Sequence, residues 1–201
     1  MKNKTHWENV YDTKLPNEVS WTQEKPETSL QLIANCKLPK TAKIIDIGGG
    51  DSNLVDYLLE QGFENITVLD ISEKAIEKAK FRLGKLSEKV KWIVSDITEF
   101  QPEETYDIWH DRATFHFLTE KEQIEKYKTL VQNYASNYLI MATFSNNGPL
   151  KCSGLEIKQY TIRDLVGLFS DKFKIIDSFY QDHQTPFNTV QNFVFCIFKR
   201  I

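Results

Sequence analysis

The stretch KIIDIGGGDS at residues 43–52 joins a short, β-branched apolar run to three consecutive glycines. Lys43–Ile47 has the composition of a buried strand, and the glycines let the backbone turn with positive φ and approach a ligand closely. The next residues, Ser52–Gln61, place three leucines on one helical face and are followed by a glycine. The sequence therefore predicts a strand, a glycine turn and a helix in succession.

The same alternation continues along the chain. Further strands are expected at 65–69, 90–94, 106–110 and 138–144, and helices at 72–83, 120–133 and 162–169. Strands that alternate with helices of this length predict βαβ units and a parallel, doubly wound sheet.

The two ends of the sequence depart from this alternation. Phe173–Tyr180 and Val190–Lys199 predict two long strands with no helix between them, which we expect to form an antiparallel pair at the sheet edge. His6–Tyr11 and Glu27–Cys36 predict helices that cover the opposite end. The expected fold is one α/β domain over 1–201, a mostly parallel seven-stranded sheet with an antiparallel last strand. We divide it into a helical cap (1–40), a cofactor-binding core (41–145) and an acceptor-side segment with the terminal strand pair (146–201).

Composition limits the class of protein. A net charge of −3 over 201 residues disfavours general binding to nucleic acid, which needs a surplus of Lys and Arg. The three cysteines lie far apart and form no CxxC pair, so no metal site is expected; Cys152 is expected in an exposed loop. The N-terminus lacks the apolar core of a signal peptide, and the longest apolar stretch, 138–144, is too short to span a bilayer. These features predict a cytoplasmic protein without a membrane partner.

Acidic residues follow three of the predicted strands. Asp46 lies inside the first strand, and Asp51 follows the glycines. This pair suits a cationic ligand better than a pyrophosphate, and the third glycine of a G-x-G-x-x-G fingerprint is replaced by Asn53. Asp70, at the end of the second strand, can accept both hydroxyls of a ribose. Asp96, after the third strand, can accept the exocyclic amine of adenine.

The order IIDIGGGDS, VLDIS, SDI, YDIWHDRA and YLIMATF resembles the class I S-adenosylmethionine-dependent methyltransferases over nearly the whole chain. The resemblance implies S-adenosylmethionine as the cofactor, with its methionine portion near the glycines, its ribose at Asp70 and its adenine between Asp96 and Ile97. The cofactor-binding residues expected on this basis are Asp46, Gly48, Gly49, Gly50, Asp70, Ile71, Asp96, Ile97 and Trp21.

The segment HDRATFHF at 110–117 holds the candidates for work on the methyl acceptor. Asp111, His110 and His116 are the only clustered groups there that can transfer a proton or bind substrate. The structural alternative is that Asp111 pairs with Arg112 or caps a helix and that His116 packs beside it. Three aromatic residues before the first strand, Trp7, Tyr11 and Trp21, either close over the methionine end of the cofactor as a lid or pack the N-terminal helices.

This segment resembles two branches of the family. Thiopurine and tellurite-type small-molecule methyltransferases carry a similar W-D-R segment and a Gly-Pro pair, here Gly148 and Pro149. Lysine methyltransferases that act on elongation factors are similar in an acid-basic-Gly-Thr segment, compared with 111–114 here, and in an opening like HWENVY…VSW. Both usually have glycine where this chain has Ala113.

The leading hypothesis is methyl transfer to a small-molecule thiol, chalcogen or amine. Methylation of a protein lysine is the nearer alternative, and a flat acidic groove beside Asp111 would favour it. Two more distant hypotheses are a non-catalytic module that binds adenosine compounds or a partner protein, and a nicotinamide-dependent oxidoreductase. Asp46 and the missing third glycine disfavour the oxidoreductase.

Overall fold

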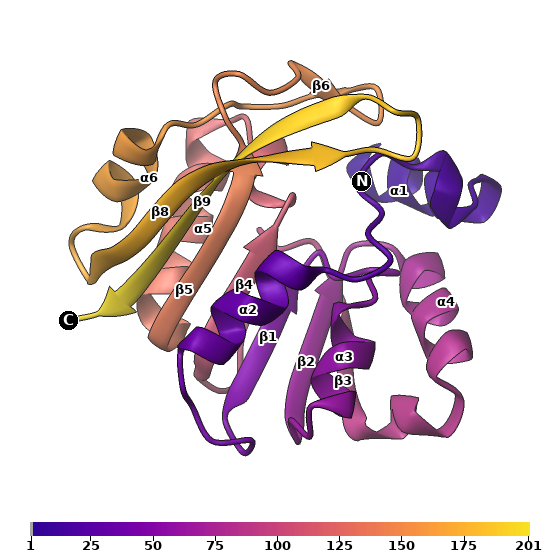
Figure 1. Cartoon of the computed structure of the whole chain (residues 1–201), viewed down its shortest axis with the longest axis horizontal. Coiled ribbons are helices and arrows are strands. Elements are labelled where there is room, and N and C mark those ends of the chain that lie inside the picture. Colours follow the sequence, from indigo (N-terminus) through magenta and orange to yellow (C-terminus); the bar gives the residue numbers. More distant parts are fainter. Residues whose placement is uncertain (1) are drawn as a thin grey trace.

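The computed structural model describes residues 2–201 and contains the predicted seven-stranded sheet (Figure 1). Five strands run parallel: β1 (Lys43–Ile47), β2 (Asn65–Asp70), β3 (Val90–Val94), β4 (Tyr106–Arg112) and β5 (Ala135–Phe144). The strand order is β3-β2-β1-β4-β5-β9-β8, so the chain reverses direction across the sheet between β1 and β4. Ligands of doubly wound sheets bind beside such a reversal, at the carboxyl ends of the strands.

The expected antiparallel terminal pair is also present. β8 (Phe173–Gln184) and β9 (Val190–Arg200) form a long hairpin, and β9 lies between β5 and β8, antiparallel to both. Within the seven-stranded sheet of residues 2–201, β9 is therefore the only strand that runs opposite to the others, as the sequence predicts. A separate two-stranded ribbon, β6 (Lys151–Cys152) and β7 (Leu155–Glu156), follows β5.

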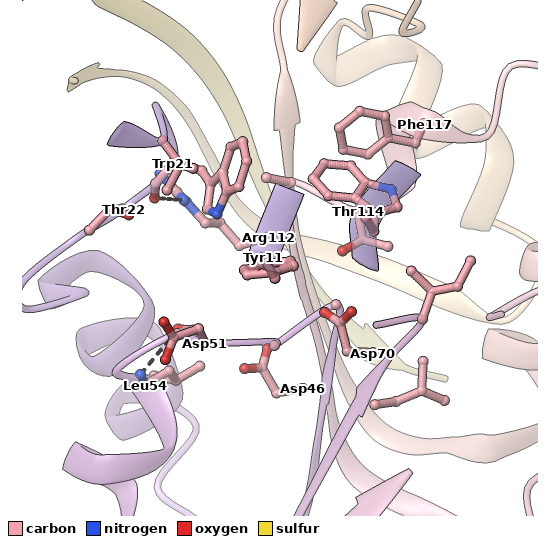
Figure 2. Close-up of a pocket in the computed structure, with 18 of the residues that line it drawn as sticks. Tyr11, Trp21, Thr22, Asp46, Asp51, Leu54, Asp70, Arg112, Thr114 and Phe117 are labelled. Carbon is pink, nitrogen blue, oxygen red and sulfur yellow. Dashed lines mark hydrogen bonds between the residues drawn. The ribbon is translucent and has the colours of Figure 1, made fainter. Parts of the chain in front are cut away.

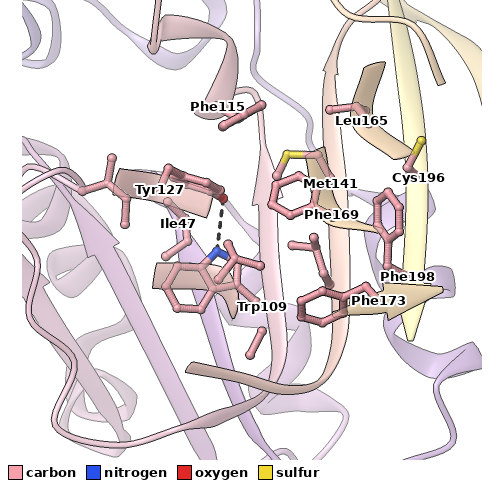
Figure 3. Close-up of a cluster of buried hydrophobic side chains, with 14 of the residues drawn as sticks. Ile47, Trp109, Phe115, Tyr127, Met141, Leu165, Phe169, Phe173, Cys196 and Phe198 are labelled. Carbon is pink, nitrogen blue, oxygen red and sulfur yellow. Dashed lines mark hydrogen bonds between the residues drawn. The ribbon is translucent and has the colours of Figure 1, made fainter. Parts of the chain in front are cut away.

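Both faces of the sheet are covered by helices, which explains the nearly continuous apolar runs of its strands. One face packs on α2 (Glu27–Asn35) and α3 (Leu54–Glu60), and the other on α5 (Lys121–Tyr134) and α6 (Ile162–Phe169). The core under α5 and α6 contains Trp109, whose indole N–H donates to the Tyr127 hydroxyl at 3.1 Å (Figure 3). Along each strand the side chains alternate between these faces, so Ile108 faces α2 and Trp109 faces α5.

Two further helices stand at the binding end of the sheet. α4 (Glu73–Leu83) follows β2 and begins at Ser72, whose side chain accepts from the Ala75 amide. α1 (Lys2–Thr13) lies against α4, on the side toward which the parallel strands point (Figure 1). Short 3₁₀ turns complete the described chain: η1 (Pro16–Glu18), η2 (Gly84–Lys89) and η3 (Phe115–Phe117). Over residues 2–201, none of the helices combines the length and apolar character that crossing a membrane requires.

Candidate functional site

A pocket of about 280 Å³ lies at the carboxyl ends of the parallel strands. Its walls come from the loops after β1, β2, β3 and β4, and its roof from α1 and the segment that joins α1 to α2 (Figure 2). Eight of the nine residues expected to bind the cofactor line this pocket: Asp46, Gly48, Gly49, Asp70, Ile71, Asp96, Ile97 and Trp21. The ninth, Gly50, is not a lining residue but adjoins Asp70 and Tyr11, which are.

The glycine loop has a backbone that other residues could not adopt without strain. Gly48 and Gly50 have φ values of 66° and 42°, and the Gly48 amide donates to the Leu69 carbonyl at 2.7 Å. A Cβ at Gly48 would lie 1.8 Å from the Thr114 hydroxyl oxygen, and one at Gly50 would lie 2.8 Å from an Asp70 carboxylate oxygen. The absence of a side chain at Gly50 therefore leaves room for the Asp70 carboxylate.

Asp46 is held in place by a buried chain of polar groups. His110 Nδ1 lies 2.7 Å from its carboxylate, and His110 Nε2 lies 2.9 Å from the Ser29 hydroxyl of α2. Because a carboxylate can only accept, Nδ1 donates to Asp46, and Nε2 is the nitrogen that meets the Ser29 hydroxyl. His110 lines the pocket, but both of its nitrogens are occupied, so its contribution is to orient Asp46.

The other two acids are also fixed by their own loops. Asp70 accepts a hydrogen bond from the Ser72 amide at 2.8 Å, and its burial raises the pKa of its carboxyl group to about 7. Asp96 accepts from the Thr98 amide at 2.9 Å and from the Thr98 hydroxyl at 2.8 Å, both at one carboxylate oxygen. Each acid therefore presents a defined edge to the pocket before any ligand binds.

The aromatic residues before β1 form the roof of the pocket. Trp7 meets both Trp21 and Phe117 edge-to-face, with ring centroids 5.5 and 5.1 Å apart, and Tyr11 lies 6.3 Å from Trp21. All four side chains line the cavity. They both cover the pocket and pack on one another, so the lid and packing roles expected for these aromatics are not exclusive.

Polar contacts dock the roof at both of its sides. On one side, Glu8 of α1 accepts from the Ser72 hydroxyl and from the amides of Glu73 and Lys74, at 2.9 to 3.1 Å. These amides belong to the first turn of α4, where an anionic partner is stabilising. On the other side, His6 lies 3.3 Å from the Ser153 hydroxyl, between β6 and β7. α1 therefore spans the opening from α4 to the β6–β7 turn.

Asp111 does not face the pocket. Its side chain has no exposed surface and accepts from the Tyr127 hydroxyl at 2.6 Å and from the amides of Thr114 and Phe115 at 3.1 and 3.2 Å. Because β4 continues to Arg112, the strand alternation turns Asp111 toward α5 and leaves His110 and Arg112 on the α2 face. The expectation that Asp111 acts on the acceptor is therefore replaced by its structural alternative, that of a buried cap.

His116 also lies outside the pocket wall. Its ring has no exposed surface and stacks on Phe144, with centroids 4.3 Å apart. Burial lowers the pKa of the imidazole to about 3, with a smaller contribution from the positive charge of Arg112. His116 is consequently a neutral packing residue at physiological pH, which removes it from the candidates for proton transfer.

Two residues outside the expected set of site residues lie in the pocket wall. Arg112 Nη1 donates to the Trp21 carbonyl at 2.7 Å, and the guanidinium carbon lies 4.8 Å from the centre of the Phe193 ring. Cys152 is buried, not exposed as expected, and lies in the pocket wall. Burial raises the pKa of its thiol to about 11, so it is protonated at neutral pH and a weak nucleophile.

Comparison with known proteins bears on this geometry. A model of the family described as "Methyltransferase domain" matches residues 44–134. An S-adenosylmethionine-dependent methyltransferase structure from Anabaena variabilis superposes with a TM-score of 0.77 and 13% identity, covering 100% of this chain and 96% of its own. The match over residues 44–134 and the shared fold support a class I S-adenosylmethionine-dependent methyltransferase.

Curated relatives of this methyltransferase differ in length and named substrate. "Malonyl-[acyl-carrier protein] O-methyltransferase 1" of Ilyobacter polytropus is 29% identical over 53% of this chain, a match that covers 40% of the relative. Human "EEF1A lysine methyltransferase 2" is 25% identical over 87% of this chain and 75% of the relative. The chain therefore spans less than half of the first relative and three quarters of the second.

These comparisons confirm the predicted fold and support the predicted family and cofactor. They leave the individual contacts to the cofactor as predictions. Of the two residues that the motifs missed, Arg112 was detectable from strand alternation alone, since it lies two positions after His110 on the same face. The position of Cys152 depends on the path of a loop, for which the sequence gives no periodic signal.

Proposed function

We propose that this methyltransferase transfers the methyl group of S-adenosylmethionine to the nitrogen of a small-molecule amine. The observation that carries the proposal is the aromatic roof, the four side chains Trp7, Tyr11, Trp21 and Phe117. Aromatic faces attract cations through the ring quadrupole, and clusters of them recognise alkylated ammonium groups.

The pocket fits the cofactor in chemistry as well as in place. Its floor presents Asp70 for the ribose hydroxyls and Asp96 with Ile97 for adenine, while Asp46 and the Gly48 turn face the methionine portion. Bound S-adenosylmethionine supplies an electrophilic methyl group on a sulfonium, and attack by an amine nitrogen breaks the carbon–sulfur bond to give S-adenosylhomocysteine and a methylammonium. The positive charge thus moves from sulfur to nitrogen, and a wall of aromatic rings and carboxylates suits both locations.

The chain's own contribution to this reaction is alignment and exclusion of water. Holding two reactants in line supplies several orders of magnitude in rate, and a neutral amine needs no base before it attacks. Asp111 and His116 are buried away from the cavity, in keeping with a reaction in which neither takes a proton from the acceptor. The proton of the methylammonium is lost to water after transfer.

The docked roof favours a small acceptor over a folded protein. α1 is fixed to α4 through Glu8 and to the β6–β7 turn through His6, so it covers the pocket. The flat acidic groove beside Asp111 that would suit a lysine-bearing surface is replaced by buried contacts to Tyr127. A protein lysine remains the second candidate, because the human lysine methyltransferase matches this chain over 87% of its length and a lysine side chain is itself an amine.

The test is an acceptor screen with a matched variant of the roof. Release of S-adenosylhomocysteine is measured with panels of small amines, small thiols, lysine peptides and intact translation factors. We expect turnover with amines, and we expect Trp7→Leu to lower kcat/KM by about 3- to 30-fold, the worth of one cation–π contact. Trp7→Phe, which keeps an aromatic face, should retain most of the activity, and both variants should bind S-adenosylhomocysteine within about twofold of the wild type.

The outcomes separate the two candidates. Methylation of thiols but not of amines, or equal activity of Trp7→Leu and the wild type on amines, would refute the amine proposal. Turnover confined to lysine in an intact protein would replace the small-molecule acceptor with the second candidate.

A further inference from the structure

Arg112 differs from Arg82 and Lys78, two other basic residues of the pocket wall. The Arg82 guanidinium pairs with the carboxylates of Asp51 and Asp56, and the Lys78 ammonium donates to the Lys14 carbonyl. Arg112 makes one hydrogen bond, to the neutral carbonyl of Trp21. Within residues 2–201, no carboxylate lies at ion-pair distance from its guanidinium.

This guanidinium is charged and largely removed from water. Desolvation lowers the pKa of Arg112 only to about 10, so the side chain stays protonated at neutral pH. The side chain lines the cavity, and its guanidinium carbon lies 4.8 Å from the centre of the Phe193 ring. Charges buried in proteins are normally paired, so a positive group left open on a cavity wall indicates an anion on the ligand.

The arrangement around Arg112 narrows the identity of that anion. Arg112 and His110 lie on the same face of β4, and His110 is the cross-strand neighbour of Asp46 on β1. The wall therefore presents a carboxylate and a guanidinium on one face, and both side chains line the pocket. Figure 2 shows Arg112 reaching toward Trp21, with Asp46 drawn below it. An acid and a base so placed complement the ammonium and carboxylate groups of an α-amino acid.

We infer that Arg112 binds the carboxylate of the amino-acid end of the cofactor, opposite Asp46, and thereby selects S-adenosyl amino acids over simpler adenosine thioethers. The inference rests on the cofactor of the proposed function and not on its acceptor. A guanidinium can grip a carboxylate with two parallel hydrogen bonds, and a lysine ammonium in its place offers only a point charge. The same chemistry would also serve a carboxylate on the acceptor, so the experiment must distinguish the two sources.

The test compares two ligands by calorimetric titration. S-adenosylhomocysteine carries the amino-acid end, whereas 5′-methylthioadenosine has the same adenosine and thioether without it. We expect Arg112→Gln to weaken binding of S-adenosylhomocysteine by about 10- to 100-fold and binding of 5′-methylthioadenosine by less than about twofold. Arg112→Lys, which keeps the charge and is the safer variant for folding, should weaken the first ligand by about 3- to 10-fold. Lys14→Gln, which removes an exposed cation at the rim of the same pocket, is the control and should change neither affinity by more than about twofold.

Each result decides the matter. Equal weakening of both ligands would assign Arg112 to the shape of the wall and overturn the inference. Unchanged affinity for both, with a raised KM for carboxylate-bearing amines, would place the anion on the acceptor and overturn it as well. A wild-type protein that binds neither ligand would overturn the proposed function together with the inference, whereas wild-type binding that is insensitive to Arg112 would overturn the inference alone.

Discussion

The contacts that build the floor of the pocket join residues close together in the sequence, whereas those that build the roof join residues far apart. On the floor, Asp70 and Asp96 are each held by a group two positions further along the chain. In the roof and the β4 wall, Trp21 meets Arg112 across 91 positions and His6 meets Ser153 across 147. The floor is therefore shaped by local backbone geometry, while the roof exists only once distant parts of the chain have come together.

This contrast implies that the floor and the roof have different roles in ligand binding. Short loops fixed to the ends of buried strands have little freedom, so the floor is preorganised for the adenosine part of the cofactor. The roof includes α1, which has no fully buried residue within 3–13 and is exposed on its outer side, so it is the part of the pocket that opens most easily. Ligand exchange is thus expected to proceed through α1 and not through the loops after β1, β2 and β3.

The largest effect is expected at the point where floor and β4 wall touch, Gly48. We predict that Gly48→Ala costs more than about 3 kcal/mol in the free energy of unfolding and abolishes cofactor binding, because the new methyl group would overlap the Thr114 hydroxyl. Gly62→Ala is the matched control: Gly62 has φ of 84° with no atom within 4 Å of an added Cβ, so only the backbone cost of about 1 kcal/mol applies. Thermal and urea unfolding measure both. Combining Gly48→Ala with Thr114→Ala should recover part of the loss, and equal costs for the two glycine variants would show that the overlap is unimportant.

The next effect concerns the floor and depends on pH. With the pKa of Asp70 at about 7 in the free protein, we predict that affinity for S-adenosylhomocysteine rises between about pH 5.5 and 8, as the carboxylate that accepts the ribose hydroxyls becomes ionised. Asp70→Asn should weaken binding by about 1.5–3 kcal/mol at about pH 8, and the difference should shrink toward about pH 5.5, where the wild type is also protonated. Calorimetry across this pH range tests the prediction. A deficit independent of pH would contradict it.

Stability should show the opposite trend in the same range. The folded-state pKa of Asp70 lies above its unfolded value, so the folded protein binds the proton more tightly and stability falls as pH rises from about 4 to about 7. Asp111, whose pKa burial raises to about 6, adds to the fall over the lower part of this range. Removing the Asp70 charge in Asp70→Asn should flatten the upper part of the curve of melting temperature against pH.

The smallest effect on ligand binding is expected from the far side of β4. Tyr127→Phe removes the hydroxyl that donates to Asp111 and accepts from Trp109, and we predict a loss of about 1–3 kcal/mol in unfolding free energy. The dissociation constant of S-adenosylhomocysteine should change by less than about twofold. Tyr134→Phe on the same helix, where the hydroxyl makes no hydrogen bond within residues 2–201, is the control and should be nearly neutral. A large loss of ligand affinity in Tyr127→Phe would contradict this prediction and indicate that Asp111 contributes to ligand binding.

The same contrast explains what the sequence could predict. The glycine turn and the acids after β1, β2 and β3 are encoded by neighbouring residues, so the motifs are enough to place them in the pocket. The predicted fourth strand stops at His110, two residues before its end, and this puts Asp111 on the wrong side. Continuing the strand alternation by two residues directs Asp111 into the core and Arg112 into the pocket. The contacts of Cys152 and Ser29 depend on tertiary packing alone, which no local pattern records.

The position of β9 has a consequence for synthesis of the chain. β5 and β8 both pair with β9, along residue pairs from Phe144–Phe193 to Phe173–Arg200, and do not touch each other in the sheet. Until residues 190–200 leave the ribosome, the nascent protein therefore carries an unpaired edge on β5, an apolar strand buried in the finished molecule. A ribosome that stalls before residue 190 would present that edge to other chains, so translation of β9 also closes a route to aggregation.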